Sequence, residues 1–248
     1  MHRTLGLIGS GMVGSSIARL AISAGLDVVL SNSRGPETLA DLVAELGGRA
    51  RAATPAETAR AADLVVLAIP LMAFQKLPAA ALAGKTVLDT ANYYPERDGH
   101  LTELDTGAST SSALIQRHLA DSHVVKAFNT ITPHQLLSLA RPADATDRSA
   151  LPIAGDNASA KAEATYLLNL LGYDAVDIGP LTDSWRTEPN TPAYIRPYLG
   201  EIPAMDVDAF LRWTRQTPGI PVPATQLTEL LETAVRQTAG EAKLPSAD

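Results

Sequence analysis

A glycine-rich turn near the start of the chain constrains the fold more than any other stretch. Gly9, Gly11 and Gly14 follow a short apolar strand expected over residues 5–8, and they precede a helix expected over about residues 15–24. In this setting the first glycine permits a tight turn, the second leaves room for a pyrophosphate, and the third lets helix and strand pack closely. The free N–H groups at the helix start also favour an anion. We therefore interpret the turn as a dinucleotide site rather than a plain strand-to-helix connection.

The exit of the second expected strand carries the next informative residues. The strand at 27–30 is followed by four residues that include no acid: Ser31, Asn32, Ser33 and Arg34. An NAD-selective site usually places Asp or Glu here to bind the ribose 2′-hydroxyl. Small hydroxyl and amide groups beside an arginine instead suit a 2′-phosphate, so the sequence favours NADP. The alternative is a polar surface turn with a solvated arginine, because Gly35-Pro36 also starts a helix.

The alternation of expected strands and helices predicts an α/β, Rossmann-like doubly wound parallel sheet. The apolar run at 63–69 is typical of a strand buried on both faces. In such sheets the carboxyl ends of the strands face the ligand crevice, which makes Ile69 and Pro70 candidates for the cofactor wall. Pro70 equally fits simple strand termination. Further strands are expected at 49–52, 86–90 and 123–128, and helices at 36–46, 55–62 and 111–119.

Two more strand exits should bring polar residues to the same crevice. The strand at 86–90 leads to Asn92, Tyr93 and Tyr94, and the strand at 123–128 leads to Asn129. The Gly- and Ser-rich stretch at 96–109 is expected to form a substrate-side loop or lid, because irregular loops of this length are uncommon unless functional or mobile. Thr110 and the pair Thr132-Pro133 are expected to cap the helices that follow them.

The second half of the chain changes in character. Residues 151–178 predict a strand, a turn and cap at Gly155-Asp156-Asn157, a helix over 158–171 and a strand, which either extends the sheet or forms a small lobe. Eight prolines between Pro180 and Pro223 predict an extended or irregular segment. Helices are expected at 207–216 and 224–237, the latter with Leu227, Leu230, Leu231 and Val235 on one face. We divide the chain into a cofactor-binding domain at 1–140, a small α/β lobe at 150–182 and a Pro-rich helical tail at 183–248.

Composition excludes several classes of function. A net charge of −7 argues against nucleic acid or an anionic membrane surface as the main partner. The absence of cysteine excludes disulfides and thiol catalysis. The longest apolar run, 64–74, is too short for a membrane span, and no signal-peptide pattern is present, so we expect a cytoplasmic protein. The five histidines lack metal-ligand spacing, so no metal site is expected; each is interpreted as a surface or hydrogen-bonded histidine.

With these pieces placed, the chain resembles the NADPH:coenzyme F420 (8-hydroxy-5-deazaflavin) oxidoreductase family over about residues 4–186. The motifs are Gly-Ser-Gly-Met-Val-Gly at 9–14, Ser-Asn-Ser-Arg at 31–34, Ala-Ile-Pro at 68–70, Val-Val-Lys-Ala-Phe-Asn-Thr-Ile at 124–131 and Gly-Pro-Leu at 179–181. The resemblance implies a homodimer of Rossmann type that transfers a hydride between NADP(H) and a deazaflavin. It also implies a set of contacts by position. Ser10, Gly11, Met12 and Val13 would hold the pyrophosphate; Ser31, Asn32, Ser33 and Arg34 the 2′-phosphate; Ile69, Pro70 and Asn92 the ribose and nicotinamide; and Ala127 to Asn129 would lie beside the nicotinamide ring.

The chain departs from the family pattern in two places. Characterised archaeal members carry a histidine where this chain has Asn129, and the tail from about Thr187 exceeds a minimal member by some 60 residues. We expect the tail to be a dimer arm or a cover over the crevice.

Three functional hypotheses follow. Hydride transfer between two ring systems needs stacking and exclusion of water more than acid–base groups. Reduction of a small imine or carbonyl would need a proton donor, for which Tyr93, Tyr94 and Lys126 are candidates. Lys126 is alternatively an ion-pair partner, and Trp185 and Arg186 border either the substrate or a dimer contact. A non-enzymatic NADP(H)-binding regulator would have a filled crevice. The candidate catalytic residues are Asn129, Lys126 and Tyr94.

Overall fold

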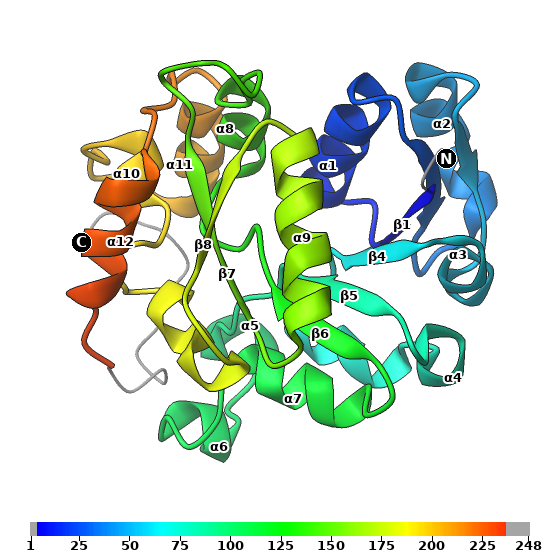
Figure 1. Cartoon of the computed structure of the whole chain (residues 1–248), viewed down its shortest axis with the longest axis horizontal. Helices are drawn as coiled ribbons and strands as arrows, with labels where there is room; N and C mark the ends of the chain where they lie inside the picture. Colours follow the sequence, from blue (N-terminus) through cyan, green and yellow to red (C-terminus); the bar gives the residue numbers. More distant parts are fainter. Residues whose placement is uncertain (1–3, 237–248) are drawn as a thin grey trace.

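The computed structural model describes residues 4–236 of the 248-residue chain. One eight-stranded sheet crosses the molecule in the order β3-β2-β1-β4-β5-β6-β7-β8 (Figure 1). The first six strands in this order are parallel; β7 joins β6 in the antiparallel sense, and β8 is parallel to β7. The α/β class and the doubly wound sheet expected from the sequence are confirmed.

The strands are short and close to their expected positions. They are β1 (Thr4–Ile8), β2 (Asp27–Ser31), β3 (Ala50–Ala52), β4 (Leu64–Leu67), β5 (Thr86–Asp89), β6 (His123–Lys126), β7 (Ala150–Gly155) and β8 (Asp174–Asp177). The helices of the sheet's two faces are α1 (Met12–Ser23), η1 (Pro36–Leu39), α2 (Ala40–Leu46), α3 (Pro55–Ala61), η2 (Leu71–Lys76), α4 (Ala79–Leu82), α7 (Ser111–His118), α8 (Pro133–Ser138) and α9 (Ala158–Leu170).

Alternation along β4 explains why the sheet is covered on both sides. Val66 belongs to the core that packs against α1 and α9, whereas Val65 and Leu67 belong to the core against α3, α4 and α7. All three side chains are buried. Because successive side chains of a strand point to opposite faces, a continuous apolar run is what a doubly covered parallel strand requires. Figure 1 shows α9 crossing one face of the sheet.

Side-chain caps at helix starts hold as expected at two positions. Thr110 accepts from the Ala113 N–H at the start of α7, and Asn157 accepts from the Ala160 N–H at the start of α9. Thr132 precedes α8 but makes no capping bond; its hydroxyl bonds the Gln135 side chain instead. The helix after the glycine turn begins at Met12, earlier than the expected residue 15.

The stretch at 96–109 is more ordered than expected. It contains two single-turn helices, α5 (Pro95–Asp98) and α6 (Thr102–Asp105). The buried Tyr93 hydroxyl holds this stretch by bonding to Asp105 Oδ1 at 2.6 Å and accepting from the Leu101 N–H at 2.9 Å. The stretch is therefore not irregular, because a phenol anchors the backbone; its role as a substrate-side loop or lid stays a prediction.

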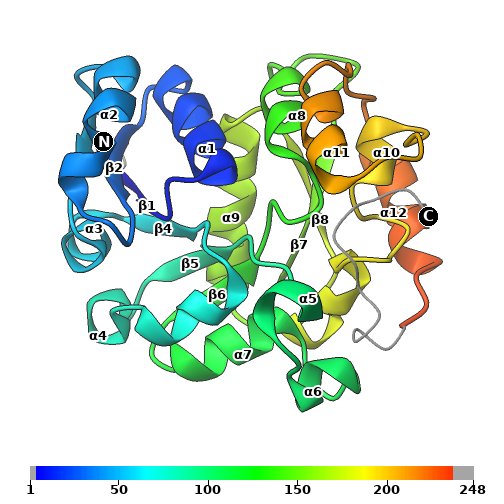
Figure 2. The same cartoon turned by 180° about the vertical axis from the view of Figure 1, so that it is seen from behind.

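The Pro-rich segment lies over the edge of the sheet that is formed by the carboxyl ends of the strands. It forms η3 (Leu181–Thr187), α10 (Arg196–Leu199), α11 (Val207–Thr214) and α12 (Ala224–Glu232). Figure 2 shows α11 beside α8, with α10 on the far side of α11. Tyr194, Ile195, Leu199 and Phe210 form a small apolar cluster with Tyr94, which fixes this segment to the exit of β5.

The last helix is shorter than expected. Leu227 and Leu231 are buried as the pattern predicts, but α12 ends at Glu232 and Val235 is 74% exposed. The placement of Val235 on the buried face was therefore wrong, and Gln237 lies outside the described residues. The division into three domains stays a prediction; β7 and β8 lie at the edge of the same sheet as β6. Within residues 4–236, no helix has both the length and the hydropathy needed to cross a membrane.

Candidate cofactor-binding pocket

The three glycines of the first turn have distinct surroundings. Gly9 has φ +106°, and a Cβ at this position would overlap the carbonyl of Ala68 on the neighbouring strand exit. A Cβ at Gly14 would overlap the carbonyl of Gly9. A Cβ at Gly11 would meet no atom within 4 Å. Gly9 and Gly14 thus serve close packing of β1, α1 and β4, whereas Gly11 faces open space, where the fingerprint places a pyrophosphate.

The start of α1 presents its N–H groups without a protein partner for the cap. Gly11 is the N-cap residue, no side chain caps it, and the first turn holds no acid. Ser10 turns the other way and donates its hydroxyl to the Ser31 carbonyl at 2.9 Å. The Gly9 N–H donates to the same carbonyl at 2.9 Å. These two bonds tie the exits of β1 and β2 together and leave the helix start open to an anion.

Of the four residues at the β2 exit, two have side chains that are bonded within the protein and two have side chains that remain available to a ligand. Ser31 is buried, and its hydroxyl donates to the Leu7 carbonyl at 3.2 Å. Asn32 Oδ1 accepts from the N–H groups of Arg34 (2.9 Å) and Gly35 (3.0 Å), which closes an Asx turn. The expectation that the Ser31 hydroxyl donates to a phosphate is wrong, because that proton is already used inside the sheet.

Ser33 and Arg34 are exposed at this turn. Among residues 4–236, the Arg34 guanidinium has no hydrogen-bond or ion-pair partner. An unpaired arginine beside the β2 exit is what recognition of a 2′-phosphate requires.

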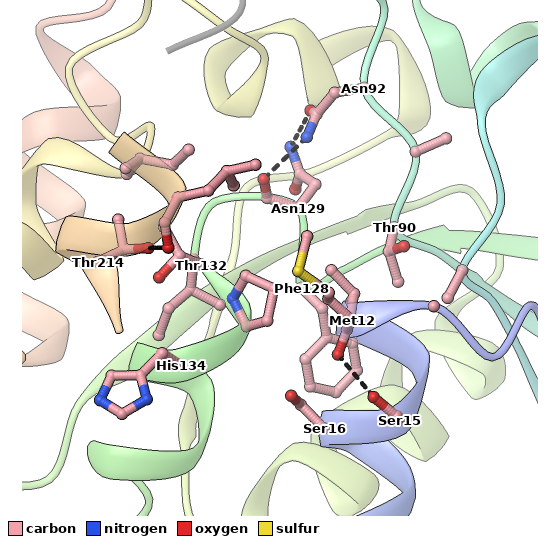
Figure 3. Close-up of a pocket in the computed structure, with 18 of the residues that line it drawn as sticks. Met12, Ser15, Ser16, Thr90, Asn92, Phe128, Asn129, Thr132, His134 and Thr214 are labelled. Carbon is pink, nitrogen blue, oxygen red and sulfur yellow. Dashed lines mark hydrogen bonds between the residues drawn. The ribbon is translucent and has the colours of Figure 1, made fainter. Parts of the chain in front are cut away.

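A pocket of about 930 Å³ opens at the carboxyl ends of β1, β4, β5 and β6 (Figure 3). Its floor is the start of α1 and its walls are the strand exits, including the expected Ile69, Pro70 and Asn92. The opposite wall comes from α8 and from the C-terminal segment. The residues that this segment contributes are Tyr194, Ile195, Val207, Phe210, Leu211, Thr214 and Arg215. The tail therefore covers the crevice, one of the two roles expected for it.

Amide side chains meet at the inner end of the pocket. Asn129 Nδ2 donates to Asn92 Oδ1 at 3.1 Å, and Asn92 Nδ2 donates to the Asn129 carbonyl at 3.0 Å (Figure 3). Asn129 Nδ2 also donates to the Thr187 carbonyl at 2.7 Å. Asn129 Oδ1 is buried and has no partner among the described residues. A buried acceptor without a donor costs about 1–3 kcal/mol, so this oxygen is suited to accept from a ligand amide.

Two tyrosines form a hydroxyl pair in the pocket wall. The Tyr94 hydroxyl bonds the Tyr194 hydroxyl, and Asn92 Nδ2 reaches the latter at 3.5 Å. Burial raises the pKa of the Tyr94 phenol and raises that of Tyr194 further above its ordinary value. Both phenols therefore stay protonated at neutral pH and can donate a hydrogen bond.

Lys126 does not reach the pocket. Its ammonium is fully buried and donates to Asp89 Oδ2 at 3.3 Å, to Ser111 Oγ at 3.1 Å and to the Ala91 carbonyl. Asp89 and Lys126 are register partners at the ends of β5 and β6. This placement agrees with the ion-pair alternative rather than with a proton donor.

Two residues in the pocket wall have positive φ although neither is glycine. Phe128 has φ +61° and Ile195 has φ +56°. The two segments that carry these residues are joined by a backbone hydrogen bond: the Ile195 N–H donates to the Thr130 carbonyl at 2.9 Å. Such conformations are uncommon, above all for a β-branched residue. The strain therefore lies where the tail meets the exit of β6.

The remaining candidate residues from the sequence are Ala127, the pair Trp185 and Arg186, and the histidines. Ala127 is buried in the sheet core. Arg186 stacks over Trp185 at 4.6 Å and donates to the Leu231 carbonyl at 3.1 Å, so this pair holds α12. His134 is partly exposed and lines the pocket, which is compatible with its interpretation as a surface histidine. His100 pairs with Asp105 at 3.0 Å, and His2 lies outside the described residues. No group of three metal-binding side chains occurs within residues 4–236.

Sequence reasoning missed the residues that the tail supplies: Thr187, Tyr194, Phe210 and Arg215. For α11 a local signal was present, because Val207, Phe210, Leu211 and Thr214 recur at helical spacing and all four line the pocket. Thr187 and Tyr194 lie outside that helix and share no such period. The concentration of aromatic residues among the prolines was a second signal.

The fold and this site define an NADP(H)-dependent oxidoreductase of the Rossmann type. Residues 4–93 match the family described as NADP oxidoreductase, coenzyme F420-dependent, which confirms the resemblance over that range. A hypothetical protein from Sinorhizobium meliloti is 27% identical with a TM-score of 0.64, covering 74% of this chain and 88% of that one. A protein named as a candidate F420-dependent NADP reductase from Arthrobacter sp. FB24 is 26% identical with a TM-score of 0.62, covering 74% and 87%.

More distant structures share the fold alone. An imine reductase variant from Myxococcus stipitatus in complex with NAD⁺ is 19% identical with a TM-score of 0.52, covering 73% of this chain and 56% of that one. A search of curated proteins gives no match to this chain.

Proposed function

We propose that this protein transfers a hydride between NADP(H) and a deazaflavin of the coenzyme F420 type. The observation that carries the proposal is a continuous pocket that extends from the glycine turn to the aromatic residues of the tail. At about 930 Å³ it lies at the upper end of the range for ligand sites, which gives space for a nicotinamide and a second planar ring. The family match and the Arthrobacter relative's name support the same partner.

The chain's own residues would bind the cofactor, orient its nicotinamide ring and exclude water from the site. Gly11 and the start of α1 would hold the pyrophosphate, and Arg34 the 2′-phosphate. Asn129 Oδ1, the buried acceptor without a donor, would accept from the nicotinamide amide and so fix which ring face is presented. Phe128, Phe210 and Leu211 would keep water from the donor and acceptor carbons. The cofactor supplies the hydride chemistry when bound.

A second candidate is reduction of a small imine or carbonyl by NADPH, favoured by the hydroxyl pair of Tyr94 and Tyr194. In that reaction the hydride goes to the substrate carbon, and the nitrogen or oxygen takes a proton. A neutral phenol in the pocket wall is a suitable donor. The proton lost from Tyr194 would be replaced from solvent through Tyr94.

The tail covers the pocket without filling it, and this open space supports an enzyme rather than a non-enzymatic regulator.

An absorbance assay that follows NADPH distinguishes the two reactions. The wild type is offered the deazaflavin and, separately, a panel of cyclic imines and aldehydes. Tyr194→Phe serves as the diagnostic variant, because it removes the tail's hydroxyl and keeps the ring. Deazaflavin turnover, retained in Tyr194→Phe, supports the first reaction. No deazaflavin turnover, together with panel turnover that Tyr194→Phe abolishes, would replace it with the second.

The homodimer and the cytoplasmic location expected from the sequence remain predictions. Light scattering on the purified protein measures the oligomeric state directly, and fractionation of the producing cells measures the location.

A further inference from the structure

We infer that the C-terminal segment completes the cofactor site, with Arg215 binding the pyrophosphate of NADP(H). Arg215 follows directly after α11 and lines the same pocket as Gly11, Met12 and Val13. Its Nη2 lies 3.8 Å from the Met12 Sδ atom, one residue beyond the glycine that faces open space. The inference rests on the proposed function, because it requires NADP(H) in this pocket.

The charge of the pocket supports an anionic ligand at this place. The protein has a net charge of −7, yet Arg19, Arg97 and Arg215 line the pocket and no Asp or Glu is among its lining residues within 4–236. Arg19 is paired with Glu45 at 2.6 Å, and Arg97 with Asp98 at 2.8 Å. Arg215 alone of the three has no carboxylate partner in the described chain. It therefore faces the uncapped start of α1 with an uncompensated charge.

The backbone on both sides of Arg215 is held in place by α8. The buried Gln135 of α8 donates its Nε2 to the Thr214 carbonyl at 3.0 Å and to the Thr217 carbonyl at 2.7 Å, on either side of Arg215. The Tyr173 hydroxyl in turn donates to the Leu136 carbonyl of α8 at 2.7 Å. α8 packs directly against α1. The backbone that carries Arg215 is thus joined to the glycine turn through α8 and α1, and this connection places the arginine near the helix start, where its Nη2 lies 3.8 Å from Met12 Sδ.

Position separates this role from that of Arg34. Arg34 lies at the β2 exit, where only the 2′-phosphate distinguishes NADP from NAD. Arg215 follows α11 and faces the start of α1, where both cofactors place the same pyrophosphate. Arg215 should therefore act on affinity for either cofactor, and Arg34 on the choice between them.

The test measures dissociation constants of NADPH, NADH and 2′-phosphoadenosine by fluorescence titration and calorimetry. Arg215→Gln should weaken NADPH and NADH by the same factor, about tenfold or more, as expected for loss of a charge-assisted hydrogen bond. It should leave 2′-phosphoadenosine, which lacks the pyrophosphate, unchanged. Arg34→Gln should weaken NADPH and 2′-phosphoadenosine and spare NADH.

Arg212→Gln is the matched control, because Arg212 lies on α11 three residues before Arg215, is exposed and does not line the pocket. It should change no affinity. Arg215 is exposed as well, so its substitution should leave the unfolding temperature unchanged. Arg215→Lys keeps the charge without the planar fork and should lose less than Arg215→Gln.

Unchanged NADPH and NADH affinity in Arg215→Gln would overturn the inference, and so would an equal loss in Arg212→Gln. A raised KM for the hydride acceptor with intact cofactor affinity would assign Arg215 to the acceptor instead and would also overturn it. Failure of the wild type to bind NADPH would instead remove the proposed function itself, which keeps the two failures apart.

Discussion

Replacing Lys126 with methionine should destabilise the protein strongly while leaving the pocket chemistry intact. The substitution keeps an unbranched apolar stem but removes the buried ammonium. Asp89 then keeps only two donors, the Ala91 N–H at 2.8 Å and the Ser112 hydroxyl at 2.7 Å, for a fully buried carboxylate. The Ala91 carbonyl also loses its donor.

The expected loss is about 3–5 kcal/mol, the usual cost of leaving one member of a buried ion pair without its partner. Against a total stability of about 5–15 kcal/mol for a domain, that is a large fraction. The double variant Lys126→Met with Asp89→Asn removes both charges and keeps an acceptor for Ala91. It should therefore be more stable than Lys126→Met alone, by about 1–2 kcal/mol.

Urea unfolding of the purified variants measures these differences. Lys85→Met is the control, because Lys85 is half-buried and its ammonium bonds one group within residues 4–236, the Ala62 carbonyl at 2.7 Å; this substitution should cost clearly less stability. A loss below about 1 kcal/mol in Lys126→Met would refute the reasoning on the ion pair. Loss of turnover in a Lys126→Met protein that is still folded would restore Lys126 as a catalytic candidate.

Three further predictions follow from named contacts. Gly11→Ala should keep its unfolding free energy within about 0.5 kcal/mol of wild type yet lose NADPH affinity in titration. Gly14→Ala, whose Cβ overlaps a carbonyl, should lose about 1–3 kcal/mol of stability in urea unfolding. Equal destabilisation of the two variants would contradict this prediction. Arg34→Ala should weaken NADPH by about 1.5–3 kcal/mol in calorimetry and leave NADH nearly unchanged; equal losses would refute the 2′-phosphate role. Burial and the hydrogen bond to Asp105 raise the pKa of Tyr93 to about 12. The unfolded chain ionises this phenol near pH 10. The contribution of Tyr93 to the free energy of unfolding should therefore be constant below pH 10 and be lost between about pH 10 and 12. Tyr93→Phe should reduce the fall in stability over that range in urea unfolding; an unchanged slope would contradict the assignment.

The cofactor half of the molecule could be predicted because its signals are local. The Gly9–Gly14 spacing needs only one turn and one helix start, and the β4 run needs only its apolar character. Thr110 and Asn157 were identified as caps from their own helices. The pairing of Asp89 with Lys126 was also within reach, since both residues end neighbouring parallel strands.

The other half depends on contacts between distant residues, which a single sequence does not display. Tyr194 meets Tyr94 across 100 positions, and Gln135 holds α11 from about 80 positions away. The Ser31 hydroxyl was assigned to a phosphate because its burial against Leu7 could not be known from the strand exit alone. Val235 fitted the apolar period, but the helix ended before reaching it.

Phe128 and Ile195 have a consequence for protein engineering. A positive φ at a residue other than glycine costs about 1–3 kcal/mol, and here both such costs fall on the wall that shapes the crevice. A screen that selects only for heat resistance would reward relaxing these two backbones. The selected variants would be more stable proteins with an altered pocket wall. At these positions we therefore expect gains in thermal stability to come with losses in turnover.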